Sequence, residues 1–330
     1  MKHVSILVPL GHSSLVNIEG TYQLFSAVNE LLEGQGRERL FDLHLVGLQA
    51  ETHQSSGLFT VNPDRLVHQV AHTDLVIIPA LFGDQHLNKE RNAPFLPWIV
   101  EQYHTGAEVV SYCIGAFFLA ETGLLLGKQC STHWRHVEEL RRLYPGVQVL
   151  DDRIMTEDNG IYTSGGAYSA LNLQLYLVEK FAGRDIAVLI SKLFMIDIDR
   201  VSQSPFIIFE GQKGHGDRPI QKAQEYIENH YAEKISVDGL ADMLALSRRN
   251  LERRFKKATH NTVAEYIQRV KMEAAKKNLE SGQQNVAEVM YDVGYNDTKA
   301  FRDVFRKITG MTPLAYRNKY IRHRGLAEQE

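Results

Sequence analysis

One stretch of the chain reads Ser236-Val-Asp-Gly-Leu-Ala-Asp-Met-Leu-Ala-Leu-Ser-Arg-Arg-Asn-Leu-Glu-Arg-Arg-Phe255. A second stretch reads Asn285-Val-Ala-Glu-Val-Met-Tyr-Asp-Val-Gly-Tyr-Asn-Asp-Thr-Lys-Ala-Phe-Arg-Asp-Val-Phe305. After one inserted residue at the turn of the second copy, Leu251 matches Phe301 and Phe255 matches Phe305. A repeat of both apolar spacing and turn chemistry predicts two helix-turn-helix units.

Helix-capping residues support these two units. Ser236 is a good N-cap for a helix over 237–245, and Ser247 for one that runs to about Thr259. Either Asn296 or Asp297 caps the last helix of the repeat. Further helices are expected over 220–231, 263–281, 286–293 and 298–309. At about 1.5 Å per residue the helix over 263–281 spans roughly 28 Å, enough to separate the two units.

The second helix of each unit exposes polar side chains opposite its apolar stripe. Arginine can pair with guanine through two hydrogen bonds, asparagine can pair with adenine, and threonine can meet a base or a thymine methyl. Cations later in each helix are better placed to hold phosphates. The candidate DNA-binding residues are Arg248, Arg249, Asn250, Arg253, Lys256 and Lys257 in the first unit, and Thr298, Lys299, Arg302, Arg306 and Lys307 in the second. The alternative is that each is only a solvated helix charge.

Charge is distributed unevenly along the 330 residues. Residues 218–324 contain 21 Lys and Arg against 13 Asp and Glu, a net charge of +8; the whole chain has 37 and 40, so the rest has 16 and 27, a net of −11. This asymmetry predicts that only the C-terminal part meets a polyanion. Cys113 and Cys130 are too few for a disulfide framework or a zinc site, so no metal or cofactor is expected. The two cysteines fit a reduced, cytoplasmic location. No apolar run approaches the roughly 18 residues needed to span a membrane.

The first two hundred residues alternate between strand and helix patterns. Strands are expected over 4–9, 41–48, 74–79, 108–113 and 160–163, and helices over 20–32, 97–105, 115–122 and 170–182. This alternation predicts a doubly wound, flavodoxin-like α/β domain with a parallel sheet.

Cys113 lies where one of these strands turns into a helix. Such a turn projects its side chain above the carboxyl ends of the strands, where doubly wound folds place their sites. The string Ser111-Tyr-Cys-Ile-Gly115 has the small flanking residues of a nucleophile elbow.

The block from Ser111 to Trp134 resembles the central block of the ThiJ/PfpI, or class I glutamine-amidotransferase-like, domain. Tyr162-Thr-Ser-Gly-Gly-Ala-Tyr-Ser-Ala-Leu-Asn-Leu-Gln-Leu175 is similar to a later block of the version found in a subgroup of transcription regulators. Hydrolytic relatives follow the elbow cysteine with histidine, where this chain has Ile114. The resemblance therefore implies a binding site for a small effector, amino acid or amine-like, in preference to catalysis. The alternatives are a Cys113-dependent amidase or hydrolase, and an inherited structural cysteine.

The effector site expected from this resemblance gathers around the elbow. An acidic partner in relatives corresponds to Glu19 or, by another alignment, to Asn17. Aromatic side chains suit a cationic ligand through cation–π attraction. Phe117 could also line the site, but a phenylalanine at such a position is more often a core residue. The candidate effector-binding residues are Asn17, Glu19, Phe82, Tyr112, Cys113, Ile114, His133 and Trp134.

The block from Val286 to Arg317 closely resembles the AraC/XylS-type signature, and the resemblance extends over about residues 220–322. It implies that both recognition helices enter successive major grooves of promoter DNA, about 34 Å apart. It also implies a homodimer, and an activator that contacts RNA polymerase.

These patterns predict four segments. They are an effector-binding and dimerisation domain (1–204), a linker (205–219), a DNA-binding domain (220–322) and a tail (323–330). Gly211, Gly214 and Gly216 among polar residues are typical of a linker. The apolar run 206–209 could instead dock onto a domain, which would leave only 211–218 free.

Overall fold

The computed structural model describes residues 1–198 and 202–321, and the chain divides into two compact units at Gln203 and Ser204. The expected tail over 323–330 lies outside the described residues. Among the described helices, none is both long and apolar enough to cross a membrane.

The first unit is built on a seven-stranded sheet. Its order is β12 (Met155–Asp158), β13 (Ile161–Ser164), β9 (Glu108–Tyr112), β7 (Leu75–Ile78), β1 (Lys2–Val8), β3 (Phe41–Gly47) and β6 (Arg65–Leu66). All neighbours are parallel except β12, which pairs antiparallel with β13. The predicted flavodoxin-like parallel sheet is confirmed.

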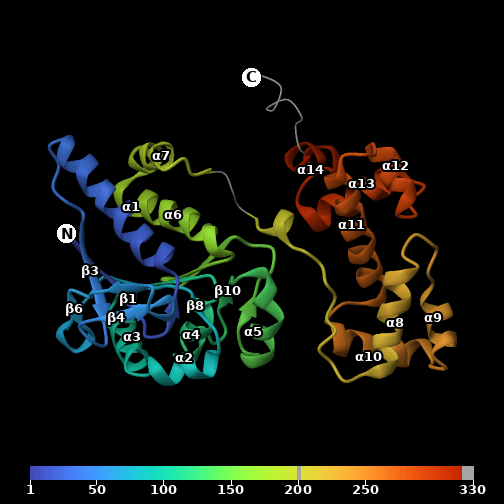
Figure 1. Cartoon of the computed structure of the whole chain (residues 1–330), viewed down its shortest axis with the longest axis horizontal. Coiled ribbons are helices and arrows are strands. Elements are labelled where there is room, and N and C mark those ends of the chain that lie inside the picture. Colours follow the sequence, from blue (N-terminus) through green and yellow to red (C-terminus); the bar gives the residue numbers. More distant parts are fainter. Residues whose placement is uncertain (199–201, 322–330) are drawn as a thin grey trace. The chain divides into compact units, whose positions relative to one another are not determined.

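Helices cover both faces of this sheet (Figure 1). One layer contains α1 (Leu15–Gly34), α6 (Ala170–Ala182) and α7 (Arg184–Leu193), and the other contains α2 (Gln85–Arg91), α3 (Phe95–His104), α4 (Gly115–Glu121) and α5 (Val137–Leu143). Short two-stranded pairs join β2 (His12–Ser13) to β8 (Leu81–Phe82), β4 (Thr52–Gln54) to β5 (Phe59–Val61), and β10 (Gln129–Cys130) to β11 (Gln148–Val149).

Strand β1 shows why this unit has two cores. Successive side chains of a strand point to opposite faces. Val4, Ile6 and Val8 therefore pack with the α1 and α6 layer, while Leu7 packs with the layer that contains α4. A strand buried on both faces is a continuous apolar run, which is the pattern that predicted it.

The second unit is entirely helical. It contains α8 (Arg218–Asn229), α9 (Val237–Met243), α10 (Arg248–Thr259), α11 (Val263–Ser281), α12 (Val286–Asp292), α13 (Thr298–Thr309) and α14 (Pro313–Tyr320). The predicted caps are confirmed: Ser236 accepts from the Gly239 amide, Ser247 from the Asn250 amide, and Asp297, not Asn296, from the Ala300 amide. Each helix-turn-helix has its own core, around Phe255 in the first and around Phe301 and Phe305 in the second.

Some expected boundaries are wrong by a few residues. Helix α1 begins at Leu15 because Ser14 caps it, five residues before the apolar spacing suggested. Helices α9 and α12 end at Met243 and Asp292, because their last residues already belong to the turn.

Residues 204–217 lie on the helical unit and are not free of it. A short 3-10 turn over Ser204–Phe206 opens the segment, and Phe209 packs with the first helix-turn-helix core. Further along, the Gln212 carbonyl accepts from Gln224 and Lys213 pairs with Glu228. Docking therefore extends past 206–209 into the glycine-containing part, where a free linker was expected.

Candidate nucleic-acid interface and effector site

Helix α10 presents one apolar and one polar face. Leu251 and Phe255, four positions apart, are fully buried. Arg249 and Arg253 are exposed on the other side, and the Arg253 guanidinium donates to the Asn250 side-chain oxygen at 3.0 Å. This hydrogen bond orients Arg253 and Asn250 together on the face predicted to read bases.

Two arginines of α10 are engaged within the protein. Arg248 is exposed and lies 3.2 Å from both an Asp238 and a Glu252 carboxylate oxygen. Arg254 binds Asp217 through two hydrogen bonds of 3.0 and 2.6 Å. The hydrogen bonds from Arg254 lower the pKa of the Asp217 carboxyl, which also caps α8. Arg254 therefore ties α10 to α8, and Arg248 would have to exchange its partners to meet DNA.

Helix α13 repeats the pattern of α10. Phe301 and Phe305 are fully buried, whereas Thr298, Lys299 and Arg302 are exposed. Within the described parts of the chain, and besides Arg253, which binds only the Asn250 side chain, six of the predicted DNA-binding cations make no ion pair with a carboxylate. They are Arg249, Lys257, Lys299, Arg302, Arg306 and Lys307. These groups are available for phosphates or bases without breaking an internal contact.

The long helix α11 connects the two helix-turn-helix parts of the helical unit. Its Tyr266 side chain belongs to the first core, and Met272, Ala275 and Leu279 belong to the second. A single continuous helix shared by both cores holds two recognition helices on one frame.

In the first unit, Cys113 adopts a backbone conformation with φ of 55°, the left-handed region. Gly115 follows, and a Cβ added there would lie 2.5 Å from the Pro79 carbonyl oxygen at the end of β7. The strand-to-helix turn therefore needs glycine at 115 for close packing. This geometry is that of the predicted elbow.

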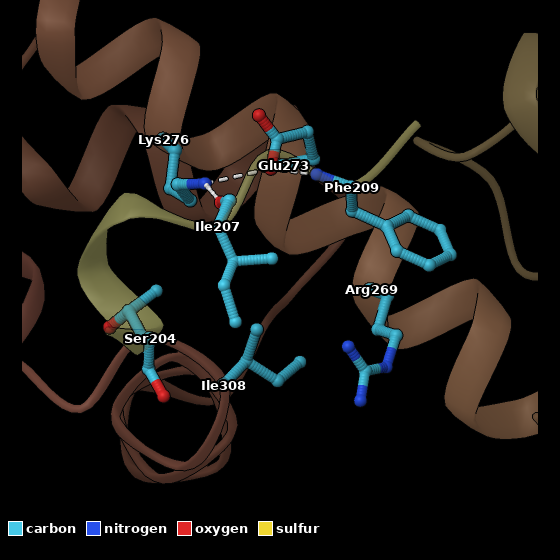
Figure 2. A pocket seen from close by; sticks show the side chains of 8 residues that line it. Ser204, Ile207, Phe209, Arg269, Glu273, Lys276 and Ile308 are labelled. Carbon is cyan, nitrogen blue, oxygen red and sulfur yellow. Dashed lines mark hydrogen bonds and ion pairs between the residues drawn. The ribbon is translucent and has the colours of Figure 1, made fainter. Parts of the chain in front are cut away.

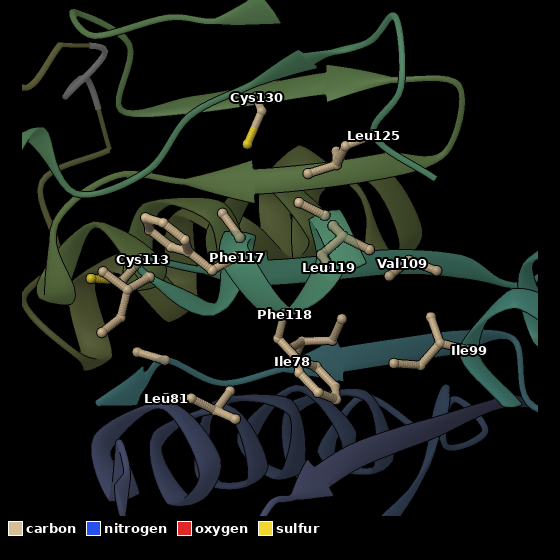
Figure 3. Close-up of a cluster of buried hydrophobic side chains, with 14 of the residues drawn as sticks. Ile78, Leu81, Ile99, Val109, Cys113, Phe117, Phe118, Leu119, Leu125 and Cys130 are labelled. Atoms are coloured by element: carbon tan, nitrogen blue, oxygen red, sulfur yellow. The ribbon is translucent and has the colours of Figure 1, made fainter. Parts of the chain in front are cut away.

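The Cys113 thiol is poorly suited to nucleophilic attack in this arrangement. The residue is 3% exposed, and burial raises the pKa of its thiol to about 11. Among the described residues, no carboxylate or imidazole forms a hydrogen bond with its sulfur. A nucleophile normally has a base within hydrogen-bonding reach. Cys113 instead packs in the core that also contains Phe117 and Cys130 (Figure 3).

His133 and Trp134 lie on the loop beside the elbow. The Thr132 hydroxyl donates to the Cys113 carbonyl at 2.9 Å, which attaches this loop to the turn. The ring centroids of His133 and Trp134 are 5.4 Å apart. Burial, followed by the charges of His136 and Arg135, lowers the pKa of His133 and favours its neutral form.

Asn17 and Glu19 were alternatives for one position, and the structure separates them. Asn17 is buried, and its side-chain oxygen accepts from the Ala80 amide just beyond β7. Glu19 is exposed on α1. Asn17 thus reaches the carboxyl end of the sheet, while Glu19 points away from the buried side of its helix.

The aromatic candidates do not form one cage. Tyr112 packs with the α1 and α6 layer, where its hydroxyl accepts from Thr21 at 3.4 Å, and Phe117 packs with the opposite layer. Because the sheet lies between the two layers, these two side chains cannot line one pocket. Phe82 is half-buried and contacts His12 at 4.9 Å between ring centroids.

Other residues of the elbow surroundings were not expected from the sequence. The Cys113 amide donates to the Ser164 carbonyl. Gly166 lies beside the His133 ring, since a Cβ added to Gly166 would be 3.6 Å from the nearest ring carbon. The Gly165-Gly166 pair was visible in the sequence as part of the later block, but nothing in its spacing indicated the contact with His133. In the described part of the chain, no cluster of three or more His, Cys, Asp or Glu residues could hold a metal ion.

Comparisons with known proteins agree with both halves of this description. The DJ-1/PfpI family model matches residues 16–180, and a helix-turn-helix domain model matches residues 240–319. The HTH-type transcriptional regulator GbdR of Pseudomonas aeruginosa is 26% identical over 305 residues, which cover 92% of this chain and 81% of that protein. The HTH-type transcriptional regulator CdhR of the same organism is 22% identical over 275 residues, covering 83% of this chain and 81% of CdhR.

A solved structure shows the same fold in the first unit. The AraC family transcriptional regulator from Pseudomonas putida superposes with a TM-score of 0.50 at 19% identity, covering 59% of this chain and all of that one. The family matches and the two recognition helices lead to one conclusion. The chain belongs to the DJ-1/PfpI family in its N-terminal unit and is an AraC-type helix-turn-helix transcription regulator.

Proposed function

We propose that this regulator binds promoter DNA with α10 and α13 together, and that a small molecule bound beside the Cys113 elbow controls this binding. The observation that carries the DNA-binding part is the repeated exposed face. Each recognition helix is capped and buries two large apolar side chains. Among the described residues, each also presents exposed cations that pair with no carboxylate, such as Arg249 on α10 and Arg302 on α13. Two such faces on one frame suit successive major grooves.

The double variant Arg253→Ala and Arg302→Ala tests the two-helix readout. Each arginine that pairs with guanine contributes about 1–3 kcal/mol of discrimination, so specific affinity should fall at least about tenfold. The probe is a DNA duplex selected from a random pool by the wild-type chain, and affinity is measured by fluorescence anisotropy. Lys277→Ala, an exposed cation on α11, is the matched control. Unchanged affinity in the double variant would show that these helices do not read the bases.

The effector site is proposed at Asn17, Ile114, His133 and Trp134. The support is that Thr132 attaches the loop of His133 and Trp134 to the Cys113 turn, and that Asn17 binds the Ala80 amide just beyond β7. Cys113 there serves as a packing residue whose thiol stays protonated. The half-buried Trp134 face, which already has Arg135 at 5.6 Å, suits an amine or amino acid. The relatives GbdR and CdhR are named HTH-type transcriptional regulators, which agrees with a role in transcription.

A thermal-shift screen of the full-length chain against amino acids, amines and their betaines tests this site. A ligand at a hundred times its dissociation constant stabilises the unit it binds by about 2.7 kcal/mol. The shift should disappear in Trp134→Ala and persist in Phe59→Ala, an exposed aromatic on β5 of the same unit. If no compound in the screen raises the melting temperature, the amine-like effector is the wrong class.

The competing function is a Cys113-dependent amidase or hydrolase. It requires a base near the thiol, and the described surroundings of Cys113 provide none by hydrogen bonding. Incubation with panels of amides and esters should therefore give no turnover. Turnover that Cys113→Ala abolishes would replace the binding-site proposal with an enzymatic one.

Homodimer formation, a cytoplasmic location and activation through RNA polymerase stay predictions of the family resemblance. Sedimentation equilibrium of the full-length chain tests the dimer, and transcription in vitro with and without the chain tests activation.

A further inference from the structure

The last residues of the first unit are anchored next to the elbow. Gln203 is 2% exposed, and its side-chain amide donates to the carbonyls of Thr132 at 3.1 Å and Asp151 at 3.0 Å. Its backbone amide donates to the Asp152 carbonyl at 3.0 Å. A Cβ added to Gly165 would lie 2.6 Å from the Gln203 side-chain oxygen. Gln203 thus fills the space that a glycine leaves open.

The two loops that Gln203 contacts are the loops that hold Cys113. Thr132 donates its hydroxyl to the Cys113 carbonyl, and the Ser164 carbonyl, directly before Gly165, accepts from the Cys113 amide. Gln203 therefore contacts Thr132 itself and, on the other loop, Gly165, the neighbour of Ser164. A ligand that moves either loop must change the surroundings of Gln203.

The Gln203 side-chain oxygen is buried and has no hydrogen-bond partner among the described residues. A buried polar atom without a partner costs about 1–3 kcal/mol. Among the described residues, the Gln203 side chain therefore satisfies its amide nitrogen but not its oxygen, which lowers the cost of moving it.

The residues after Gln203 are held on the helical unit by a buried ion pair. Lys276 of α11 donates to the Ile207 carbonyl and lies 2.8 Å from Glu273. Glu273 in turn accepts from the Phe209 amide at 3.1 Å. Figure 2 shows Lys276 and Glu273 side by side, each directed at the backbone of this segment. Lys276 is only 4% exposed, so these contacts take the place of water around its charge.

The same segment touches both helix-turn-helix units. The Phe209 ring lies 5.1 Å from the Tyr266 ring in the first core. Ser204 and Ile207 line a cavity of about 20 Å³ together with Ile308 of the second recognition helix, α13. The segment can therefore influence how the two recognition helices are held relative to each other.

We infer that residues 202–217, here named the strap, transmit the state of the elbow to the two recognition helices, with Gln203 as the anchor at the elbow. This inference rests on the proposed effector site. Ser204 follows Gln203 directly in the sequence, so the contacts of the strap with the helical unit begin at the residue next to the elbow anchor. Displacement of Gln203 must move Ser204 or break hydrogen bonds at one end.

Hydrogen–deuterium exchange of the full-length chain, without any ligand, tests this coupling from both ends. Lys276→Met removes the strap's anchor on α11 and should raise exchange about tenfold in peptides over 202–212, equivalent to about 1.4 kcal/mol of easier opening. Because coupling is reciprocal, exchange over 148–166 should rise as well. Gln203→Met, which keeps side-chain length but removes the amide, should raise exchange in both places from the other end. Lys277→Met, the exposed neighbour of Lys276, is the matched control and should change neither peptide.

Faster exchange confined to the mutated end, in either variant, overturns the inference, as does unchanged exchange at both ends. If circular dichroism shows that one variant is unfolded, the other variant decides. The test contains no effector, so its result is separate from the ligand screen. A failed screen with coupled exchange removes the proposed effector, whereas a successful screen with uncoupled exchange removes the strap.

Discussion

At the scale of a single residue, the reactivity of the Cys113 thiol distinguishes a binding site from a catalytic site. Burial raises the pKa of its thiol to about 11 and that of Cys130 to about 12. Since the thiolate is the reactive form, alkylation of the native chain by iodoacetamide should be slow at neutral pH and rise about tenfold per pH unit up to pH about 10. Mass spectrometry of peptides containing each cysteine measures the two rates separately.

The unfolded chain is the control for this measurement, because both thiols should then titrate near their ordinary pKa of 9.0. A rate at Cys113 that is already at its plateau at pH 7 would show an activated thiolate, and would favour the hydrolase.

Gly294 is the residue at which the backbone most clearly requires glycine. It has φ of 74°, and a Cβ there would lie 2.0 Å from the Ala232 carbonyl oxygen. Gly294→Ala should destabilise the helical unit by at least about 2 kcal/mol, since left-handed strain adds to a clash with backbone. Urea unfolding followed by circular dichroism measures the change.

Gly216→Ala is the comparison, because nothing lies within 4 Å of its added Cβ and its φ is outside the left-handed region. It should be neutral, or stabilising by up to about 1 kcal/mol through the unfolded state. Equal effects of the two substitutions would mean that the turn after α12 tolerates a side chain.

At the scale of elements, Lys257 of α10 and Lys307 of α13 occupy matching positions of the repeat. Both are exposed and make no ion pair within the described residues, so we expect each to contact one phosphate. Each phosphate contact contributes about 0.9 to the slope of log affinity against log salt. Lys257→Ala and Lys307→Ala should each reduce the slope by about 0.9, and the double variant by about 1.8. Titration of the selected duplex over a range of salt concentrations measures this slope.

Lys277→Ala on α11 should leave the slope unchanged. If only one of the two lysines affects the slope, the two helices do not approach the backbone in equivalent ways.

The helices of the second unit could be predicted closely because their signals are local. Capping side chains and a spacing of three to four apolar residues defined α10, α11 and α13 to the residue. Helix α7 was not predicted, although Ile186 and Ile190 lie four apart. It begins directly after Gly183, which ends α6.

The strap shows where local signals are insufficient. Its glycines and polar residues are typical of a linker, yet its backbone groups find partners far along the chain, such as Glu273 for the Phe209 amide and Gln224 for the Gln212 carbonyl. The elbow was predictable from its small residues, but the contact of Gln203 with Thr132 joins positions 71 apart. Nothing in the spacing of the sequence indicates such a pair.

At the scale of the whole molecule, the acidic and basic parts of the sequence correspond to units with separate cores. Over residues 1–198 and 202–321, none belongs both to the cores that flank the sheet and to the two helical cores. The net charge of +8 over 218–324 therefore resides on the unit that carries the recognition helices. This arrangement directs a polyanion to the helical unit and away from the acidic unit, which is the one proposed to bind a small molecule.

Separate cores predict that the two units unfold in two calorimetric transitions. Phe25 and Phe301 are both fully buried, one beside the sheet and the other in the second helix-turn-helix. Truncation of a buried phenylalanine to alanine costs about 3–5 kcal/mol, which corresponds to more than about 10 °C in a unit of 100 to 200 residues. Phe301→Ala should lower one transition and Phe25→Ala the other, each leaving its counterpart within about 2 °C. If either variant shifts both transitions together, or if the wild-type chain unfolds in one step, the two units are more strongly coupled than their separate cores indicate, and strap contacts would then contribute to folding as well as to control.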